Sequence, residues 1–198
     1  MGHGRVIADC AMRMGYWNVM QFFDDSVKGR LSNTNWNVIG PVSRALEGCN
    51  NTGDTAVVGI GDNAQRVSIH AQLELAGWQI ASIIDPTASV SSGASIGAGT
   101  VIMPCAAVNI GAEIATSCIV NTKASVDHDC KLGAGVHISP GATLCGGVII
   151  GERCWVGAGA TLIQNIQIGS DTRVGAGAVV IRNMPANATC VGNPARIY

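Results

Sequence analysis

Residues 119–138 read IVNTKASVDHDCKLGAGVHI, and an aliphatic residue returns in them at every sixth position. The same register extends in both directions from this stretch without an inserted loop. Its sixteen members are Val90, Ile96, Ile102, Val108, Ile114, Val120, Val126, Leu132, Ile138, Leu144, Ile150, Val156, Leu162, Ile168, Val174 and Val180. A short repeat of this kind indicates a solenoid, in which each unit buries its apolar side chain against its neighbours.

Three hexads would make one triangular coil, so residues eighteen apart should stack in adjacent coils. The residue two positions before each aliphatic is nearly always small, with Val136, Val148 and Ile166 as exceptions. The residue after it is often Gly or Asn, which suits a turn with positive φ. These expected turn residues are Gly97, Asn109, Asn121, Gly133, Gly151, Gly157, Gly169 and Gly175. The sequence therefore predicts a parallel β-helix over residues 85–198, capped by the residues after 183.

Residues 1–84 have a different pattern, in which short helical and strand segments alternate as in an α/β unit with a parallel sheet. We expect helices at 4–14 and 64–76, and strands at 19–23, 55–60 and 78–84. A helix this close to residue 1 should follow a strand and a glycine-rich turn, so this Rossmann-like unit is expected to lack its first strand. Ligands of such sheets bind at the carboxyl ends of the strands, where Asp24, Asp25, Gly61 and Asn63 fall.

The composition favours a small-molecule partner. Twelve Lys and Arg residues against thirteen Asp and Glu give a net charge of −1, without a basic run, so nucleic acid and anionic membranes are not expected partners. We recognise no signal peptide or long apolar span, and the eight cysteines form no Cys-x-x-Cys pair. These features indicate a cytoplasmic protein whose cysteines are small buried hydrophobes.

His128 is the residue of the repeat best suited to acid–base chemistry. A histidine has an ordinary pKa of roughly 6.5 and so accepts a proton near neutrality. Asp127 and Asp129 flank it, and a carboxylate bonded to one ring nitrogen makes the other nitrogen more basic. Eighteen residues further on is Gly146, whose backbone N–H would be an oxyanion donor one coil away. We therefore expect a general base and an oxyanion donor at one corner of the prism.

His137 is the second histidine of the repeat and lies nine residues, or half a coil, from His128. The two side chains cannot share one corner of one subunit. If both serve one active site, they come from neighbouring chains. That arrangement favours a homotrimer with active sites between subunits, because a triangular prism packs naturally around a three-fold axis.

The chain resembles the hexapeptide-repeat acyltransferases, specifically the nucleotide-activated 4-amino-sugar N-acetyltransferases and the related sialic acid O-acetyltransferases. The resemblance covers nearly the whole chain. It rests on Gly2-His3-Gly4, Phe23-Asp24-Asp25, GIGDN at 59–63, Asn121-Thr122, residues 127–130, HISPGA at 137–142 and GNPAR at 192–196.

This resemblance implies a left-handed β-helix and two domains, a small α/β domain for a sugar nucleotide at 1–84 and an acetyltransferase domain at 85–198. It implies that His128 is the general base and that Asp129 raises its basicity. It further implies acetyl-CoA as co-substrate, without a metal, contacted by His137, Gly146, Ala158 and Ala176. The residues implied for the nucleotide-activated sugar are Gly2, His3, Asp24, Asp25 and Gly61.

The predicted function is acetyl transfer from acetyl-CoA to the amine of a nucleotide-linked 4-amino-4,6-dideoxy sugar, for bacterial surface glycan biosynthesis. O-acetylation of sialic acid or a related sugar hydroxyl remains an alternative, because the same base and oxyanion donor would serve it. A zinc hydratase like the γ-type carbonic anhydrases would need three His ligands, whereas the repeat contains two. A non-catalytic trimeric scaffold is the remaining alternative.

Overall fold

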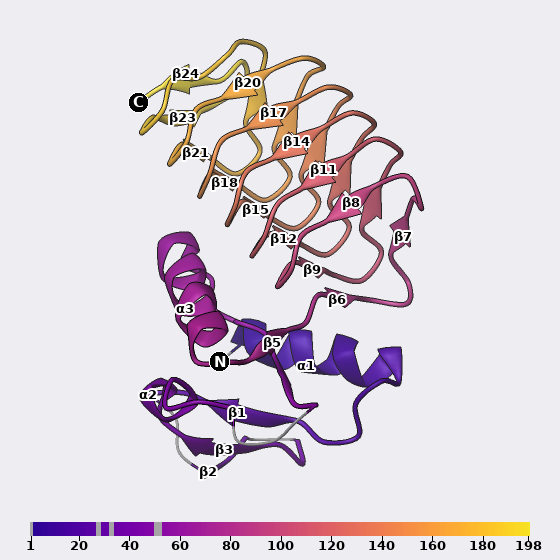
Figure 1. Cartoon of the computed structure of the whole chain (residues 1–198). Helices are drawn as coiled ribbons and strands as arrows, with labels where there is room; N and C mark the ends of the chain where they lie inside the picture. Colours follow the sequence, from indigo (N-terminus) through magenta and orange to yellow (C-terminus); the bar gives the residue numbers. More distant parts are fainter. Residues whose placement is uncertain (1, 27–28, 32–33, 50–52) are drawn as a thin grey trace.

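A computed structural model describes residues 2–26, 29–31, 34–49 and 53–198. The chain forms a small α/β region followed by a left-handed parallel β-helix of triangular cross-section (Figure 1). The fold class expected from the hexad repeat and from the α/β pattern is thereby confirmed.

The β-helix has three faces, each a parallel sheet that the chain visits once per coil. The first face contains β6 (Ile83–Ile84), β9 (Val101–Ile102), β12 (Ile119–Val120), β15 (His137–Ile138), β18 (Trp155–Val156), β21 (Arg173–Val174) and β23 (Thr189–Val191), with β24 (Arg196–Ile197) added antiparallel as the cap. The second face contains β7 (Ser89–Val90), β10 (Ala107–Val108), β13 (Ser125–Val126), β16 (Thr143–Leu144), β19 (Thr161–Leu162) and β22 (Val179–Val180). The third face contains β8 (Ser95–Ile96), β11 (Glu113–Ile114), β14 (Lys131–Leu132), β17 (Ile149–Ile150) and β20 (Gln167–Ile168).

Each aliphatic residue of the sequence register is the second residue of one of the strands from β7 to β22. Strand neighbours are eighteen residues apart, as in the pairing of Val108 with Val126 and of Val126 with Leu144. From Ile102 onward these side chains are buried and form one continuous core with the small residues two positions earlier. The coil period expected from the sequence is therefore confirmed.

Three corners connect the faces. The first corner leads from the first to the second face (for example residues 139–142), the second corner from the second to the third (127–130), and the third corner from the third back to the first (133–136). In the turns from Gly99 to Gly177 the positive-φ residue lies three positions after the inward aliphatic, as at Gly99, Ser117 and Asp129. The prediction of positive φ directly after the aliphatic residue was therefore wrong. Several glycines occupy the position directly after the aliphatic residue for a steric reason. A Cβ at Gly157, for example, would lie 2.5 Å from the backbone N of Ala176 in the next coil.

The N-terminal region contains helices and very short strands: α1 (Gly2–Met14), β1 (Gln21–Phe23), β2 (Gly29–Arg30), β3 (Asn37–Gly40), α2 (Val42–Ala45), β4 (Thr55–Ala56), α3 (Asn63–Leu75) and β5 (Gln79–Ile80). The strands form two small sheets, of order β1-β3-β2 and β4-β5. The sequence pattern predicted α1, α3, β1 and β4, but it missed β2, β3 and α2. The strand expected over 78–84 is divided, because β5 pairs with β4 whereas β6 pairs with β9 of the prism.

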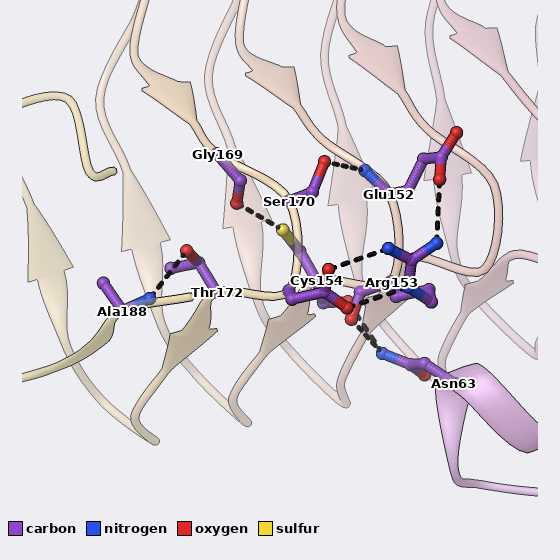
Figure 2. A network of polar contacts seen from close by, with 9 residues as sticks. Asn63, Glu152, Arg153, Cys154, Gly169, Ser170, Thr172 and Ala188 are labelled. Carbon is purple, nitrogen blue, oxygen red and sulfur yellow. Dashed lines mark hydrogen bonds and ion pairs between the residues drawn. The ribbon is translucent and has the colours of Figure 1, made fainter. Parts of the chain in front are cut away.

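Two helices attach this region to the prism. The apolar side of α1 packs on the first coils of the first face, where Ile7 and Cys10 share a cluster with Ile83 and Val101. An ion pair of 2.7 Å between Arg13 and the buried Asp85 fixes the far end of α1. The helix α3 runs along the third corner, and Figure 2 shows Asn63, at its start, reaching the corner at Arg153 and Cys154. Among the described residues, no helix has the length and apolar character needed to cross a membrane.

Candidate active site

The second corner holds His128 between its two acidic neighbours. Nδ1 of His128 lies 2.8 Å from Oδ2 of Asp129, so the Asp129 carboxylate reaches the ring. Asp127 turns the other way, where its Oδ1 accepts bonds from the backbone N of His128 at 2.8 Å and from Nδ2 of Asn109 at 2.7 Å. Asp129 adopts φ 59°, the left-handed turn position, which directs its side chain back to the ring. The imidazole is thus held through Nδ1, and Asp129 leaves Nε2 free.

Electrostatics make His128 a stronger base than an ordinary histidine. The hydrogen bond that Nδ1–H of His128 donates to Asp129 raises the pKa of His128, and the nearby charge of Asp127 raises it further. The side chain is 58% exposed, so a substrate can approach it. An oriented, accessible imidazole with a raised pKa is suited to accept a proton from an incoming nucleophile.

Gly146 lies directly against the ring of His128, in the next coil of the same corner. A Cβ on Gly146 would lie 2.5 Å from both Cε1 and Nε2 of His128, so any side chain at this position would collide with the ring. The backbone joins the two coils here, because the N–H of Gly147 donates to the carbonyl of His128 at 2.9 Å. The structure therefore brings together the predicted base and the predicted oxyanion donor.

His137 lies on the first face, in β15, and is buried between two rings. Its centroid lies 4.6 Å from that of Trp155 in the next coil and 6.1 Å from that of His3 at the start of α1. Desolvation by this burial lowers the pKa of His137 to about 3, and the positive charge of Arg66 contributes to the shift. His137 is therefore neutral at physiological pH.

The hydrogen-bond pattern assigns the tautomer of His137. Oδ1 of Asn121 accepts from the backbone N of Thr122 at 2.8 Å, which orients the amide so that Nδ2 faces Nε2 of His137 at 3.1 Å. An amide NH₂ group is a donor only, so Nε2 accepts and the single proton of the neutral ring is on Nδ1. Within the described residues this buried Nδ1–H has no hydrogen-bond partner. The described chain therefore leaves this donor unused.

The residues expected to hold a sugar nucleotide come together around the start of α1. A Cβ at Gly59 would lie 2.8 Å from Cα of Gly4, so the turn that contains Gly61 approaches the first turn of α1, with Gly2 and His3. From the other side, a Cβ at Gly4 would lie 3.7 Å from the ring of Phe22 in β1, the strand that leads into Asp24 and Asp25.

Hydrogen bonds hold these segments. Oδ1 of Asp24 accepts from the backbone N and Oγ of Ser26, at 2.8 and 2.6 Å, and Oδ1 of Asp25 accepts from the backbone N of Val42 at 2.9 Å. His3 lies where this group meets the β-helix. Desolvation, with Arg66 as the next cause, lowers the pKa of His3 to about 4, and its buried Nε2 lacks a partner among the described residues.

The two remaining predicted acetyl-CoA contacts lie elsewhere on the prism. Ala158 and Ala176 are exposed and stack in successive coils of the first corner, where the N–H of Gly177 donates to the carbonyl of Ala158 at 2.8 Å. Gly146 and His128 belong to the second corner. One subunit therefore does not bring all the predicted donor-side residues together, as the half-coil separation of His128 and His137 had indicated.

Three residues near these groups were not singled out from the sequence as site residues. Asn121 was noted only within the motif of the resemblance, although its amide fixes His137. Trp155 carries a signal that reading by coils would have found, since it lies eighteen residues after His137. Arg66 has no sequence signal, because a basic residue on an amphipathic helix is usually solvated. Within the described ranges, no three His, Cys, Asp or Glu side chains are grouped closely enough to hold a metal ion.

Comparisons with known proteins agree with this architecture. The family model of the PglD N-terminal domain matches residues 1–73, and the model of the bacterial transferase hexapeptide (six repeats) matches residues 147–182. A comparison with curated proteins finds no match.

Solved structures match over the whole chain. The acetyltransferase domain of PglB from Neisseria gonorrhoeae FA1090, in complex with acetyl coenzyme A, is 38% identical with a TM-score of 0.95, and the match covers 100% of this chain and 95% of that one. PerB from Caulobacter crescentus, in complex with CoA and GDP-perosamine, is 34% identical with a TM-score of 0.93, over 100% of this chain and 93% of that one. WeeI from Acinetobacter baumannii AYE is 27% identical with a TM-score of 0.87, over 100% and 95% of the two chains. The identity and the full-length match lead to one conclusion: this chain belongs to the hexapeptide-repeat sugar N-acetyltransferases.

Proposed function

We propose that this protein transfers the acetyl group of acetyl-CoA to the amine of a nucleotide-linked 4-amino-4,6-dideoxy sugar. The observation that carries the proposal is the contact of the Asp129-bound imidazole of His128 with the backbone of Gly146. Two relatives that match the whole chain are described in complex with acetyl coenzyme A and with CoA and GDP-perosamine, respectively. Those descriptions support acetyl-CoA as donor and a nucleotide amino sugar as acceptor.

Transfer takes place directly within a ternary complex. The amine nitrogen of the sugar attacks the thioester carbonyl, and Nε2 of His128 accepts the proton that the nitrogen loses. The N–H of Gly146 donates to the oxygen of the tetrahedral intermediate, where negative charge develops. The C–S bond then breaks, the amide is complete, and coenzyme A leaves as a thiolate that recovers a proton from His128 or from water. Asp129 keeps a proton on Nδ1 throughout, so Nε2 is the nitrogen that gains and then loses the transferred proton.

The donor side of the proposed site combines residues of the first and second corners. His137 offers its Nδ1–H, and Ala158 and Ala176 provide a side-chain-poor ridge along which the extended pantetheine arm of acetyl-CoA can lie. Because burial lowers the pKa of His137 to about 3, its ring stays neutral and does not take the proton that His128 receives. Gly146 completes the set from the second corner.

The acceptor side is the group around Gly2, His3, Asp24, Asp25 and Gly61. We propose residues 1–84 as the sugar-nucleotide domain and residues 85–198 as the acetyltransferase domain. The start of α1 and the Gly61 turn converge near His137 through His3, which supports delivery of the sugar from the small domain to the acetyl group. Synthesis of a bacterial surface glycan in the cytoplasm is the proposed setting.

The proposed assembly is a homotrimer with active sites between subunits. The outward residues of the second face are small and mostly half-buried in a single chain: Ser89, Ala107, Ser125, Thr143, Thr161 and Val179. This flat face lies between the corner with Ala158 and the corner with His128. Packing it around a three-fold axis would bring the second corner of one subunit to the first corner of the next.

The proposal is tested by incubating the protein with acetyl-CoA and a panel of GDP-, UDP- and dTDP-linked 4-amino-4,6-dideoxy sugars, with sialic acids in parallel. We expect release of free thiol only with amino-sugar nucleotides, and mass spectrometry should locate the acetyl group on nitrogen. Acetylation of sialic acid hydroxyls alone would replace the proposal by the O-acetyltransferase alternative. A protein that binds no acetyl-CoA in a thermal-shift assay would support the scaffold alternative instead.

A further inference from the structure

Arg66 is the largest group among the fully buried side chains, and it is charged. Only 1% of the residue is exposed, and no ion pair found among the described residues includes it. Desolvation lowers its pKa to about 10, which still leaves the guanidinium protonated at neutral pH. Burying a cation without a carboxylate partner is costly unless hydrogen bonds compensate for the lost water.

All five N–H groups of this guanidinium donate to protein oxygens. Nε donates to the carbonyl of Ser117 at 2.8 Å, Nη1 to the carbonyls of Ile60 at 2.9 Å and Gly61 at 3.1 Å, and Nη2 to Oδ1 of Asn63 and the carbonyl of Gly135, both at 2.8 Å. Five is the full donor capacity of an Arg side chain. The planar fork of the group matches carbonyls on several sides at once, which a lysine ammonium with three donors cannot reproduce.

The five acceptors belong to both parts of the molecule. Ile60 and Gly61 form the turn that follows β4, where we propose that the sugar nucleotide binds. Ser117 and Gly135 are equivalent positions of the third corner in successive coils, eighteen residues apart, and both have positive φ. The chain enters β15 and His137 two residues after Gly135. One side chain therefore joins the acceptor turn to the coil that carries His137.

The geometry of α3 explains why Arg66 can span the two parts. An α-helix advances about 5.4 Å per turn, and neighbouring coils of a β-helix are about 4.8 Å apart. Successive turns of α3 therefore meet successive coils. Nδ1 of His70 bonds Oγ of Ser117, and Arg66 lies one turn earlier in the helix. Asn63, at the start of the helix, donates to the carbonyls of Arg153 and Cys154, both at 2.9 Å (Figure 2). Arg66 occupies the middle turn.

We propose that Arg66 is a positioning residue for acetyl transfer: it fixes the Gly61 turn against the coil of His137, so that the bound sugar presents its amine to the acetyl group. This role rests on the proposed function, because Gly61 is a substrate contact only within that proposal. Reacting groups must meet within a few tenths of an ångström, and a misplacement of about 1 Å can cost roughly 10²-fold in rate. Arg66 itself touches neither substrate.

The matched pair of variants is Arg66→Lys and His70→Gln. Both break contacts between α3 and the third corner, but only the first releases the Gly61 turn. For Arg66→Lys we expect kcat/KM for the nucleotide sugar to fall by about 10- to 100-fold, with the KM for acetyl-CoA changed by less than about two-fold. For His70→Gln, kcat/KM for the nucleotide sugar and the KM for acetyl-CoA should both stay within about three-fold of wild type. This should hold even if the melting temperature of His70→Gln falls as far as that of Arg66→Lys.

Amide hydrogen exchange provides a readout that needs no substrate. Arg66→Lys should accelerate exchange at residues 60–63 and at 134–136, whereas His70→Gln should accelerate it only near the end of α3. The proposal would be overturned if Arg66→Lys changed the KM for the nucleotide sugar and the KM for acetyl-CoA equally. It would also be overturned if Arg66→Lys and His70→Gln had the same kinetic constants, because Arg66 would then be a purely structural contact. A wild-type protein that acetylates no nucleotide amino sugar would instead overturn the proposed function, and the positioning role with it.

Discussion

At His128, the nitrogen that faces Gly146 is the one free to take a proton, because Asp129 holds the other. Replacing His128 by Ala should therefore lower kcat by about 10²-fold or more, as expected when a general base is lost. The side chain is 58% exposed, so the melting temperature should stay close to that of wild type. Thiol release measured with saturating acetyl-CoA tests this prediction, and near-normal turnover would contradict the assignment.

Asp129 determines where the pH profile of the enzyme begins to rise. Its hydrogen bond is the main reason that the pKa of His128 lies above the ordinary value, and the reaction needs the neutral imidazole. The acidic limb of kcat/KM should therefore lie above pH ~6.5 in wild type. In Asp129→Asn the limb should move to lower pH while the plateau falls by about tenfold or more, because a weaker and less oriented base remains. A limb that does not move would indicate that another group titrates.

His137 should make the fold sensitive to acid. Its pKa is about 3 in the folded protein but roughly 6.5 when unfolded, so the unfolded chain binds more protons in between. The resulting stability is present above pH ~6.5 and is lost as the pH falls towards the folded value. Urea unfolding at several values between pH 5 and 6.5 should show a weaker pH dependence for His137→Asn than for wild type. Identical slopes would mean that His137 is not buried as the neutral form.

The sequence was informative about these residues to different degrees. The relation of His128, Asp129 and Gly146 follows from the hexad register alone, because the repeat converts a separation of eighteen residues into contact. The environments of His3 and Arg66 do not follow from it, because both depend on how α1 and α3 dock on the prism. Docking is a long-range packing event without a local signature in the sequence.

At the level of elements, the inward column of aliphatic residues sets the stability of each coil. Leu144 in β16 is fully buried and stacks between Val126 and Leu162. Replacement of Leu144 by Ala should therefore reduce the free energy of unfolding by about 2–5 kcal/mol. Chemical denaturation at fixed protein concentration measures this loss, with the exposed Gln167 on the third face as the control. Gln167→Ala should change stability by no more than about 0.5 kcal/mol, and equal losses in the two variants would contradict the assigned register.

The period of the strands was predictable, but their turn geometry was not. Sixteen aliphatic positions fixed which residue of each strand points inward, since one face of every strand must be buried. The glycines after them were interpreted as positive-φ residues, whereas the close approach of the next coil explains several of them and the positive φ lies two residues later, as at Gly99 and Gly159. In the N-terminal region the strands have two to four residues, too short to show a period, and the sequence pattern located β1 and β4 but not β2 and β3.

For the whole molecule, the small domain covers the first face near α1 and the third corner along α3. We propose that another subunit packs on the second face and the two corners beside it. One chain carries His128 and His137 on different parts of its prism, and for that reason we propose that a complete site is formed by two chains. In the proposed trimer, every subunit would contribute the base to one site and the second histidine to another, and the rigid prism would hold the two residues at a fixed separation.

Mixing of two inactive subunits tests this central claim most directly. We would co-express His128→Ala with His137→Ala, purify the mixed trimers and measure acetyl transfer to a nucleotide-linked 4-amino sugar. In a random mixture about one quarter of the sites would receive both native histidines, so roughly a quarter of wild-type activity should return. Each variant alone should stay nearly inactive under the same conditions. Activity of the mixture no higher than that of the separate variants would contradict the account, because it would mean that each subunit carries its own complete site.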